Sequence, residues 1–377
     1  MGETMKALRQ LEYAQPLQVV DFPIPQAESG TAVVKIVAAN IISYMNDVYN
    51  GARKFPYPTP LTVGVSAIGR VHELGPDATS LQKGRLVFID PLVRSRDDPT
   101  DMFLSAMHSG ATLGSKKLMT HFRDGPCAEY MSVPLECCYP CNEDHLFRSS
   151  EQGGQGCQLE DLLYMPNLLV PYGGLTDINL KPGETIIIVP ATGGFGGAAV
   201  HCALSLGARV IAMGRNKDSL ARLTETFSPH FPPGRLVTVP ATGKLEEELA
   251  AIKKAAAGGP IDALFEISPP HATNTTHLKA GMLCLRHGGR VSLMGGRSDD
   301  VGIPHTVVVH RNLTIKGKWM YERQDVRNLI RMVENGVVVP RYENRVRRAK
   351  GFGLEDWQAA FKCAEEGNSG ISAYFKL

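Results

Sequence analysis

A glycine-rich segment follows a short apolar run near the middle of the chain. Residues 185–189 read TIIIV, and the next segment, PATGGFGGAAV, holds Ala191, Thr192, Gly193, Gly194, Phe195 and Gly196. Glycine lets the backbone turn tightly, and the first N–H groups of a helix bind anions. This order of strand, glycines and helix predicts a turn that holds a dinucleotide pyrophosphate, although Ala191 replaces the first glycine of the usual GxGxxG pattern.

A basic tetrapeptide ends the next apolar run, residues 209–213. It consists of Gly214, Arg215, Asn216 and Lys217. Sites for NAD usually carry an acid here, because a carboxylate accepts hydrogen bonds from the ribose 2′-hydroxyl and repels a 2′-phosphate. The guanidinium of Arg215, the amide of Asn216 and the charge of Lys217 would instead hold a phosphate. The pattern favours NADPH, with a solvated basic turn as the alternative.

Cysteine spacing does not predict a metal site. The chain has 8 cysteines in 377 residues, too few for a disulfide scaffold, so we expect reduced thiols. Cys137, Cys138 and Cys141 lie close together in sequence, but no second CxxC or histidine pair follows at zinc spacing.

The apolar runs change character along the chain. Up to residue 90 they are short and broken by proline and glycine, as in an all-β domain (17–22, 32–38, 67–74 and 85–89). From residue 162 strand-like runs alternate with helical segments, which predicts an α/β domain with a doubly wound parallel sheet. A helix at 354–365 and a strand at 371–377 should return to the first domain. Residues 91–125 and 142–160 read as long loops or short helices, which either shape a pocket or are solvated insertions.

Composition limits the partners. Hydrophobic residues make up 43% and charged residues 21%, and the formal net charge is +2. Such a balance gives no field that would recruit nucleic acid or an anionic membrane, and no apolar stretch approaches a membrane span. We expect a cytoplasmic protein of two domains whose partner is a small-molecule substrate.

With these motifs the chain resembles the medium-chain dehydrogenase/reductase superfamily, and within it the zinc-independent quinone oxidoreductases and enoyl reductases. The resemblance rests on the start of the chain, the segments GVSAIGRVHELG and GPCAEYMSVP, the glycine turn, and RHGGRVSLMG, which ends at Gly295. It implies a GroES-like catalytic domain (1–163 and 321–377) and a Rossmann NADPH-binding domain (164–320). It also implies cofactor contacts from Thr176, beside the nicotinamide, and from Gly295, and by analogy a homodimer.

The departures from the family pattern remove its catalytic zinc. Tyr44, Val65 and Tyr172 stand where zinc-dependent members carry their cysteine, histidine and cysteine ligands, and residues 91–125 lack the cysteines of the structural zinc lobe. Valine offers no ligand atom and phenols are poor substitutes. We therefore expect no metal.

Another group must then stabilise the charge that develops as hydride arrives. Tyr44 and Tyr172 would face each other across the family's cleft, and a phenol can donate a hydrogen bond to an enolate or alkoxide. Asn46 and Tyr49 stand at the positions of the family's proton relay, and Asn46 can still bind a substrate or the nicotinamide ribose. The resulting hypothesis is a metal-free, NADPH-dependent oxidoreductase acting on an enone, quinone or activated ketone, with Tyr44, Asn46 and Tyr172 as catalytic residues. Three alternatives remain: the tyrosines only fill the vacated cavity, the chemistry is a non-redox cyclisation or isomerisation, or the protein binds NADPH without catalysis.

Overall fold

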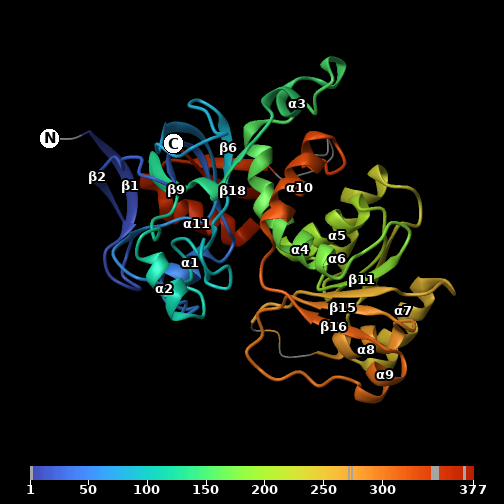
Figure 1. The fold of residues 1–377 in the computed structure, drawn as a ribbon. Helices are drawn as coiled ribbons and strands as arrows, with labels where there is room; N and C mark the ends of the chain where they lie inside the picture. Colours follow the sequence, from blue (N-terminus) through green and yellow to red (C-terminus); the bar gives the residue numbers. More distant parts are fainter. Residues whose placement is uncertain (1–2, 271, 273–274, 341–347, 368–370) are drawn as a thin grey trace. The chain divides into compact units, whose positions relative to one another are not determined.

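The computed structural model describes all residues except 1–2, 271, 273–274, 341–347 and 368–370 (Figure 1). The chain divides into two compact units, residues 1–164 with 345–377, and residues 165–344. Each unit has its own sheets and core, and each is described separately below.

The first unit is built mainly from antiparallel strands. One sheet has the order β2-β1-β4, a second has the order β10-β6-β5-β3-β18-β17 with β9 also paired to β3, and β7 pairs with β8. The strands are β1 Thr4–Gln10, β2 Gln18–Pro23, β3 Thr31–Ile41, β4 Leu61–Thr62, β5 Ala67–Leu74, β6 Leu86–Ile89, β7 Leu92–Arg94, β8 Met102–Leu104, β9 Tyr130–Pro134, β10 Cys138–Pro140, β17 Arg348–Phe352 and β18 Ile371–Lys376. Strand β18 pairs antiparallel with β3, with Ala373 opposite Ile41. The predicted return of the carboxyl-terminal strand to the first domain is therefore confirmed.

Short helices connect these strands. They are α1 Met45–Tyr49, α2 Leu113–Met119, α3 Glu143–Phe147 and α11 Trp357–Glu366, with 3₁₀ turns at Leu135–Cys137, Ser150–Gln152, Leu159–Tyr164 and Leu354–Asp356. Residues 91–125, expected as loops or short helices, form the β7–β8 hairpin and helix α2. The Thr112 side chain caps α2 by accepting a hydrogen bond from Ser115 N at 3.0 Å, and Asp101 in turn accepts from the Thr112 hydroxyl. Polar side chains thus order this segment locally.

The second unit is a doubly wound α/β domain. Its parallel sheet has the order β13-β12-β11-β14-β15-β16, from β11 Thr185–Val189, β12 Arg209–Gly214, β13 Leu236–Pro240, β14 Ala263–Glu266, β15 Arg290–Leu293 and β16 Thr314–Gly317. Its helices are α4 Met165–Asp177, α5 Gly194–Ser205, α6 Lys217–Phe227, α7 Leu245–Ala256, α8 Thr276–Cys284, α9 His305–His310 and α10 Arg323–Glu334, with a 3₁₀ turn at Ser228–His230. The predicted fold class, a GroES-like β domain with a Rossmann domain, is confirmed.

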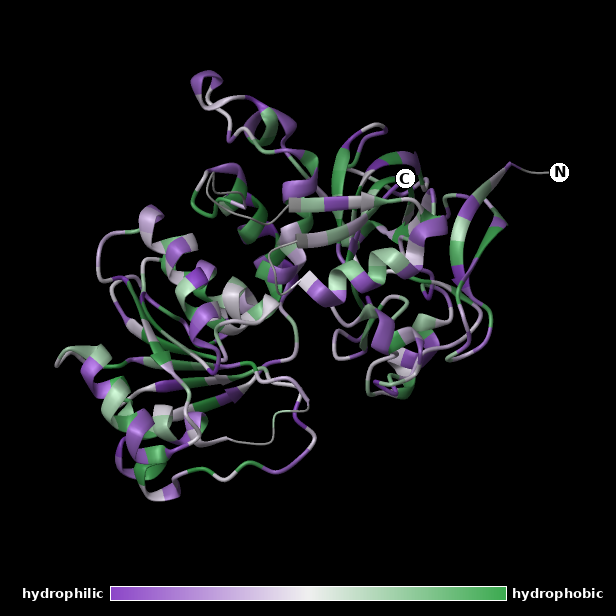
Figure 2. Ribbon diagram, turned by 180° about the vertical axis from the view of Figure 1, so that it is seen from behind, coloured by the Kyte–Doolittle hydropathy of each residue, from purple (hydrophilic) through white to green (hydrophobic). Residues whose placement is uncertain are grey.

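The parallel strands are buried, and for this reason the sequence predicts them as apolar runs. Every residue of β11 is buried, as expected when helices cover both faces of a parallel sheet. Ile187, Ile211 and Leu264 from neighbouring strands join one core cluster. In Figure 2 strands of this sheet are largely green, whereas the surrounding helices alternate green and purple residues. The strand order reverses direction between β11 and β14, which is where doubly wound sheets bind ligands.

The second boundary between the units differs from the predicted one. The sequence placed residues 321–377 with the catalytic domain, whereas the described residues 321–340 belong to the second unit. Tyr321 is 2% exposed and lies so close to Gly173 of α4 that a Cβ added there would be 2.6 Å from Tyr321 Cβ. Thr176 Oγ1, also on α4, donates to Asp325 Oδ1 of α10 at 3.0 Å. Packing of α10 on α4 therefore decides the boundary.

No helix among the described residues is long and apolar enough to span a membrane.

Candidate functional site

The glycine turn after β11 leaves the start of α5 open. Among the described residues no side chain caps this helix at Gly193, and its first intrahelical bond runs from Gly197 N to Gly193 O at 2.7 Å. Gly193 and Gly194 are exposed, and a Cβ at Gly193 would meet no heavy atom within 4 Å. At Gly196, by contrast, a Cβ would collide with Pro190 O. The first backbone N–H groups of α5 therefore have no intrahelical acceptor, and they lie at the positive end of the helix dipole. This arrangement can bind an anion.

The other predicted turn residues divide into two kinds. Thr192 and Phe195 are partly exposed beside the two open glycines. Ala191 is fully buried, and its N–H donates to Met213 O of β12 at 2.7 Å. Ala191 thus shapes the turn, while its own amide proton is already engaged.

The basic tetrapeptide lies at the carboxyl end of β12. Gly214 ends that strand, and a Cβ there would be 2.9 Å from Thr192 Cγ2, so this residue is close to the glycine turn. Asn216 caps α6, with its Oδ1 accepting from Ser219 N at 2.9 Å. Arg215 and Lys217 are exposed, and within the described part of the chain neither forms an ion pair. Asp218, in the first turn of α6, is the nearest acid along the chain. The structure thus brings the glycine turn and two unpaired cations to the same edge of the sheet.

A buried acid is the last residue of β14 at this edge, and sequence reasoning missed it. Glu266 is 5% exposed, and its Oε1 accepts from Ser268 N at 2.8 Å. His277 Nε2 lies 3.3 Å from Ser268 Oγ and 3.9 Å from Glu266 Oε1. Burial alone would raise the pKa of Glu266, but hydrogen bonds from His277 and Ser268 lower it below its ordinary value. The predicted cofactor residue Gly295 lies against this cluster, since a Cβ there would be 2.6 Å from Glu266 Oε2.

In the first unit Tyr44 precedes helix α1 and stacks against a guanidinium. Arg53 Cζ lies 3.9 Å from the centre of the Tyr44 ring, a cation–π contact. The ring is half-buried. Burial raises the pKa of Tyr44, and the nearby positive charge of Arg53 partly opposes that rise. The phenol therefore stays protonated at neutral pH and can donate a hydrogen bond. Arg53 was not identified from the sequence. The one feature that could have indicated it is its position, six residues after Asp47 in the same segment.

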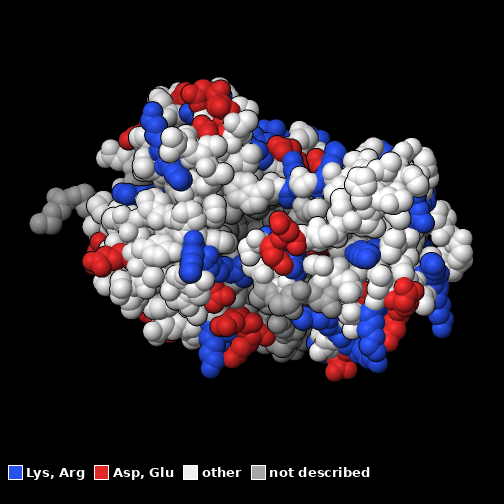
Figure 3. All heavy atoms as spheres, turned by 90° about the horizontal axis from the view of Figure 1, so that it is seen from below, with Lys and Arg blue, Asp and Glu red and all other residues white. Residues whose placement is uncertain are grey.

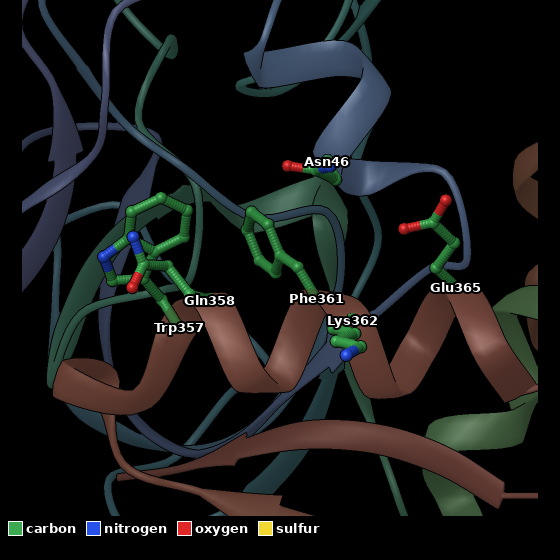
Figure 4. Close-up of a pocket in the computed structure, with 6 residues that line it drawn as sticks. All are labelled: Asn46, Trp357, Gln358, Phe361, Lys362 and Glu365. Atoms are coloured by element: carbon green, nitrogen blue, oxygen red, sulfur yellow. The ribbon is translucent and has the colours of Figure 1, made fainter.

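Asn46 lies on α1 at a cavity shared with α11. The cavity has a volume of about 470 Å³ and is lined by Asn46, Trp357, Gln358, Phe361, Lys362 and Glu365. Figure 4 shows the Trp357 and Phe361 rings projecting from α11 toward the side where Asn46 lies. Phe361, one of the lining residues, is 3% exposed. Two of the cavity's lining side chains are aromatic and four are polar or charged, so it can accommodate a small polar molecule.

Tyr172 and Thr176 lie on α4 of the second unit. Tyr172 is 5% exposed. Burial and the neighbouring carboxylate of Asp325 raise the pKa of Tyr172. A hydrogen bond with the Asn328 side chain lowers it in part. The Thr176 hydroxyl is within 3.0 Å of both Asp325 Oδ1 and Gly173 O. Both side chains thus already interact with neighbours in their own unit, and the expected approach of Tyr172 to Tyr44 stays a prediction.

Comparison with known proteins places these features in a family. The model for the alcohol dehydrogenase GroES-like domain matches residues 28–143, and the model for zinc-binding dehydrogenase matches residues 194–335. These two matches together cover most of the chain, one in each unit. The chain belongs to the medium-chain dehydrogenase/reductase superfamily. It is an oxidoreductase of this superfamily's type.

Individual relatives of this medium-chain dehydrogenase/reductase are distant. It is 20% identical over 346 residues to an NAD-dependent alcohol dehydrogenase of Sulfurisphaera tokodaii, covering 89% of this chain and 91% of that one. Alcohol dehydrogenase TADH from Thermus sp. ATN1 has a similar structure, with a TM-score of 0.77, 18% identity and 99% of each chain covered. An E. coli CFT073 alcohol dehydrogenase solved with NADH gives a TM-score of 0.76 at 16% identity, with 100% of each chain covered. At these identities the structural likeness establishes the fold alone.

Tyr49, which the resemblance matches to the superfamily's proton relay, has a hydroxyl that is hydrogen-bonded on both sides. Tyr49 O–H donates to Ala106 O at 3.1 Å, and the same oxygen accepts from Gly64 N at 2.9 Å. Burial raises the pKa of Tyr49 well above its ordinary value. Gly64 has a φ of +123°, and a Cβ there would be 2.7 Å from Pro126 Cδ, so this position requires glycine. Tyr49 thus serves to join three backbone segments of this oxidoreductase.

Proposed function

We propose that this oxidoreductase transfers hydride from NADPH to an activated C=C or C=O bond of a small organic substrate without a metal ion. The observation that carries the proposal is the edge formed by β11 and β12, where the open start of α5 lies beside the exposed cations Arg215 and Lys217. A dinucleotide fits these residues, because the pyrophosphate needs the uncapped N–H groups and the space left by Gly193.

The choice of NADPH rests on the end of β12. Several relatives carry the name NAD-dependent alcohol dehydrogenase, and a structural neighbour was solved with NADH. In this chain Gly214 occupies the position at which an NAD site usually carries an acid, and Arg215 follows directly. A guanidinium can form two parallel hydrogen bonds to a phosphate. We expect Arg215 to contact the 2′-phosphate, with Lys217 adding positive charge.

The absence of a catalytic metal is proposed from the residues at the family's ligand positions. Val65 is 7% exposed and has no donor atom, and Tyr44 and Tyr172 both carry phenols whose pKa is raised by burial. A phenol with a raised pKa is a weak metal ligand because the anionic form is scarce. Within the described ranges no three histidine, cysteine or acidic side chains gather as a metal site.

Charge stabilisation must then come from side chains of the protein. When bound, the reduced nicotinamide supplies hydride to the electron-poor carbon of the substrate. The displaced electron pair moves to the carbonyl oxygen, and Tyr44 O–H donates a hydrogen bond and then its proton to that oxygen. Solvent returns a proton to the half-buried phenol. Asn46 offers an amide that can orient the substrate at the cavity beside α11.

The test is a turnover assay with both cofactors. Purified protein is mixed with NADPH or NADH and a panel of enones, quinones and activated ketones, and the loss of reduced-nicotinamide absorbance is followed. We expect turnover with at least one substrate, a preference for NADPH, and no loss of rate after prolonged treatment with a strong zinc chelator. A wholly silent panel, or activity abolished by the chelator and restored by zinc, would contradict the proposal.

The charge pattern is consistent with a small-molecule partner. On the face shown in Figure 3, Lys and Arg side chains are interspersed with Asp and Glu. The formal net charge of the chain is only +2. Neither feature provides the continuous basic surface that nucleic acids select.

A further inference from the structure

The guanidinium of Arg53 is held beside Tyr44, and its Nε donates no hydrogen bond. Its side chain is 22% exposed, and the Nε is buried and has no hydrogen-bond partner among the described residues. The nearest carboxylate oxygen, Asp47 Oδ2, is 3.9 Å from this Nε, which is too far for a hydrogen bond. The Asp47 side chain is itself 46% exposed, so water screens the pair.

A tight turn fixes the position of Arg53. Arg53 N donates to Asp47 O at 2.9 Å, which ties the residue to helix α1. Within the turn, Ala52 N donates to Asn50 Oδ1 at 2.9 Å, and Gly51 and Lys54 adopt φ values of +81° and +50°. The Tyr44 ring then sets the plane of the guanidinium through their stacking at 3.9 Å. The donors of Arg53 are therefore oriented before any ligand binds.

The Nε is buried and out of reach of a ligand, so a ligand must bind at the exposed part of this side chain, which is 22% exposed. A guanidinium with an unpaired buried donor is costly, and a bound anion offsets part of that cost by neutralising its charge. A carboxylate matches a guanidinium better than a neutral oxygen does, because two parallel N–H···O bonds form with favourable charge. The stack also limits the directions from which a ligand can approach, since one face of the guanidinium is covered by the ring.

We propose that Arg53 binds a carboxylate on the substrate, so that the reduced C=C or C=O bond belongs to an organic acid anion. This inference rests on the proposed function, in which Tyr44 donates to the substrate carbonyl. The stack places the two groups side by side, so one small molecule can meet both. Asp47 would bias the site against more highly charged anions, because its carboxylate lies near the same guanidinium.

The experiment compares one substrate in charged and neutral forms. The probes are (E)-4-oxopent-2-enoate and its methyl ester, which share the same enone and differ in the charge at one end. The measured quantity is the ratio of kcat/KM for the anion to kcat/KM for the ester, with NADPH saturating. We expect Arg53→Met to lower this ratio about 10- to 100-fold, as befits loss of a charge-assisted hydrogen bond. Arg53→Lys should lower it less, because it keeps the charge without the planar fork.

Lys54→Met is the matched control. It removes the same charge from the next residue, whose side chain is exposed and forms no ion pair in the described ranges. We expect its ratio to equal that of the wild type. An equal fall in Lys54→Met would mean that general positive charge, rather than Arg53, attracts the anion, and would overturn the inference.

A binding measurement separates this inference from the proposed function. Calorimetric titration of the anion into protein saturated with NADP⁺ needs no turnover, and circular dichroism confirms that each variant is folded. Anion binding that Arg53→Met and Arg53→Gln both weaken would support the carboxylate site even if no NADPH is oxidised. Turnover of both probes with an unchanged ratio in Arg53→Met would refute the site while the proposed function stands, and failure of the anion to bind wild-type protein would also count against it.

Discussion

Replacing Arg215 with alanine should change cofactor preference without changing the fold. The residue is exposed at the end of β12, next to the Asn216 cap of α6, and forms no ion pair among the described residues. In the proposed complex its guanidinium meets the 2′-phosphate, a group that NADH lacks. The substitution should therefore weaken NADPH binding and leave NADH binding nearly unchanged.

The size of the effect follows from the exposure of the residue. A hydrogen bond to a charged group contributes roughly 1.5–3 kcal/mol when shielded. Exposed charge pairs contribute at most about 1 kcal/mol, because solvent screens them. At about 1.4 kcal/mol per factor of ten, the dissociation constant for NADPH should rise up to about 5-fold. Added salt should narrow the difference between wild type and variant.

The assay is titration of each protein with NADPH and with NADH, followed by calorimetry or by nicotinamide fluorescence. Arg222→Ala is the control, because Arg222 lies on α6, which begins two residues after Arg215, and its Nη2 donates to Ser219 Oγ at 2.8 Å. We expect the control to bind both cofactors as the wild type does. Equal weakening of NADPH and NADH by Arg215→Ala would refute the reasoning, since the lost contact would then not involve the 2′-phosphate.

Three further predictions concern other parts of the molecule. Tyr44→Phe should lower kcat on an enone by about 100-fold or more, as expected for a lost proton donor, while the NADPH dissociation constant measured by titration stays unchanged. Gly196→Ala should lower the free energy of unfolding by about 1–3 kcal/mol in urea titrations, because its Cβ would collide with Pro190 O. Gly197→Ala is the control and should leave the free energy of unfolding unchanged, because its Cβ would lie 3.7 Å from Ala191 O. Glu266→Gln should reduce stability at pH 7, and the wild-type advantage should shrink as pH falls below 4.5, the ordinary pKa of a glutamate. Because the pKa of Glu266 is lowered, its carboxylate form stabilises the folded state. Protonation at low pH removes that contribution. A wild-type advantage that is constant from pH 7 to pH 3 would contradict the last prediction.

Local patterns in the sequence were enough to predict the fold class and the glycine turn. The run TIIIV is buried at every position of β11, and a fully buried parallel strand reads as a continuous apolar run. The glycines at 193, 194 and 196 begin four residues after its end, so strand, turn and helix are all local features. Such features are determined by neighbouring residues in the sequence, and for this reason they could be predicted from the sequence.

Features that depend on distant packing could not be read in this way. The unit boundary is set by Tyr321 against Gly173, two residues far apart in sequence. The cluster of Glu266, Ser268 and His277 forms only when the loop after β14 brings α8 back to the sheet edge. The stack of Arg53 on Tyr44 requires a turn in which a lysine adopts a positive φ, and nothing in the residue type announces that conformation.

Two tyrosines differ in how readily they can supply the final proton. The resemblance matches Tyr49 to the family's relay, but its hydroxyl proton is donated to Ala106 O and its oxygen already accepts from Gly64 N. Passing a proton through it would break both of these buried hydrogen bonds, and each costs more to break when no water can replace it. Tyr44 is half-buried and needs no such rupture to exchange with solvent. We therefore expect proton delivery through Tyr44, so that Tyr49→Phe impairs folding stability while Tyr44→Phe impairs the chemical step.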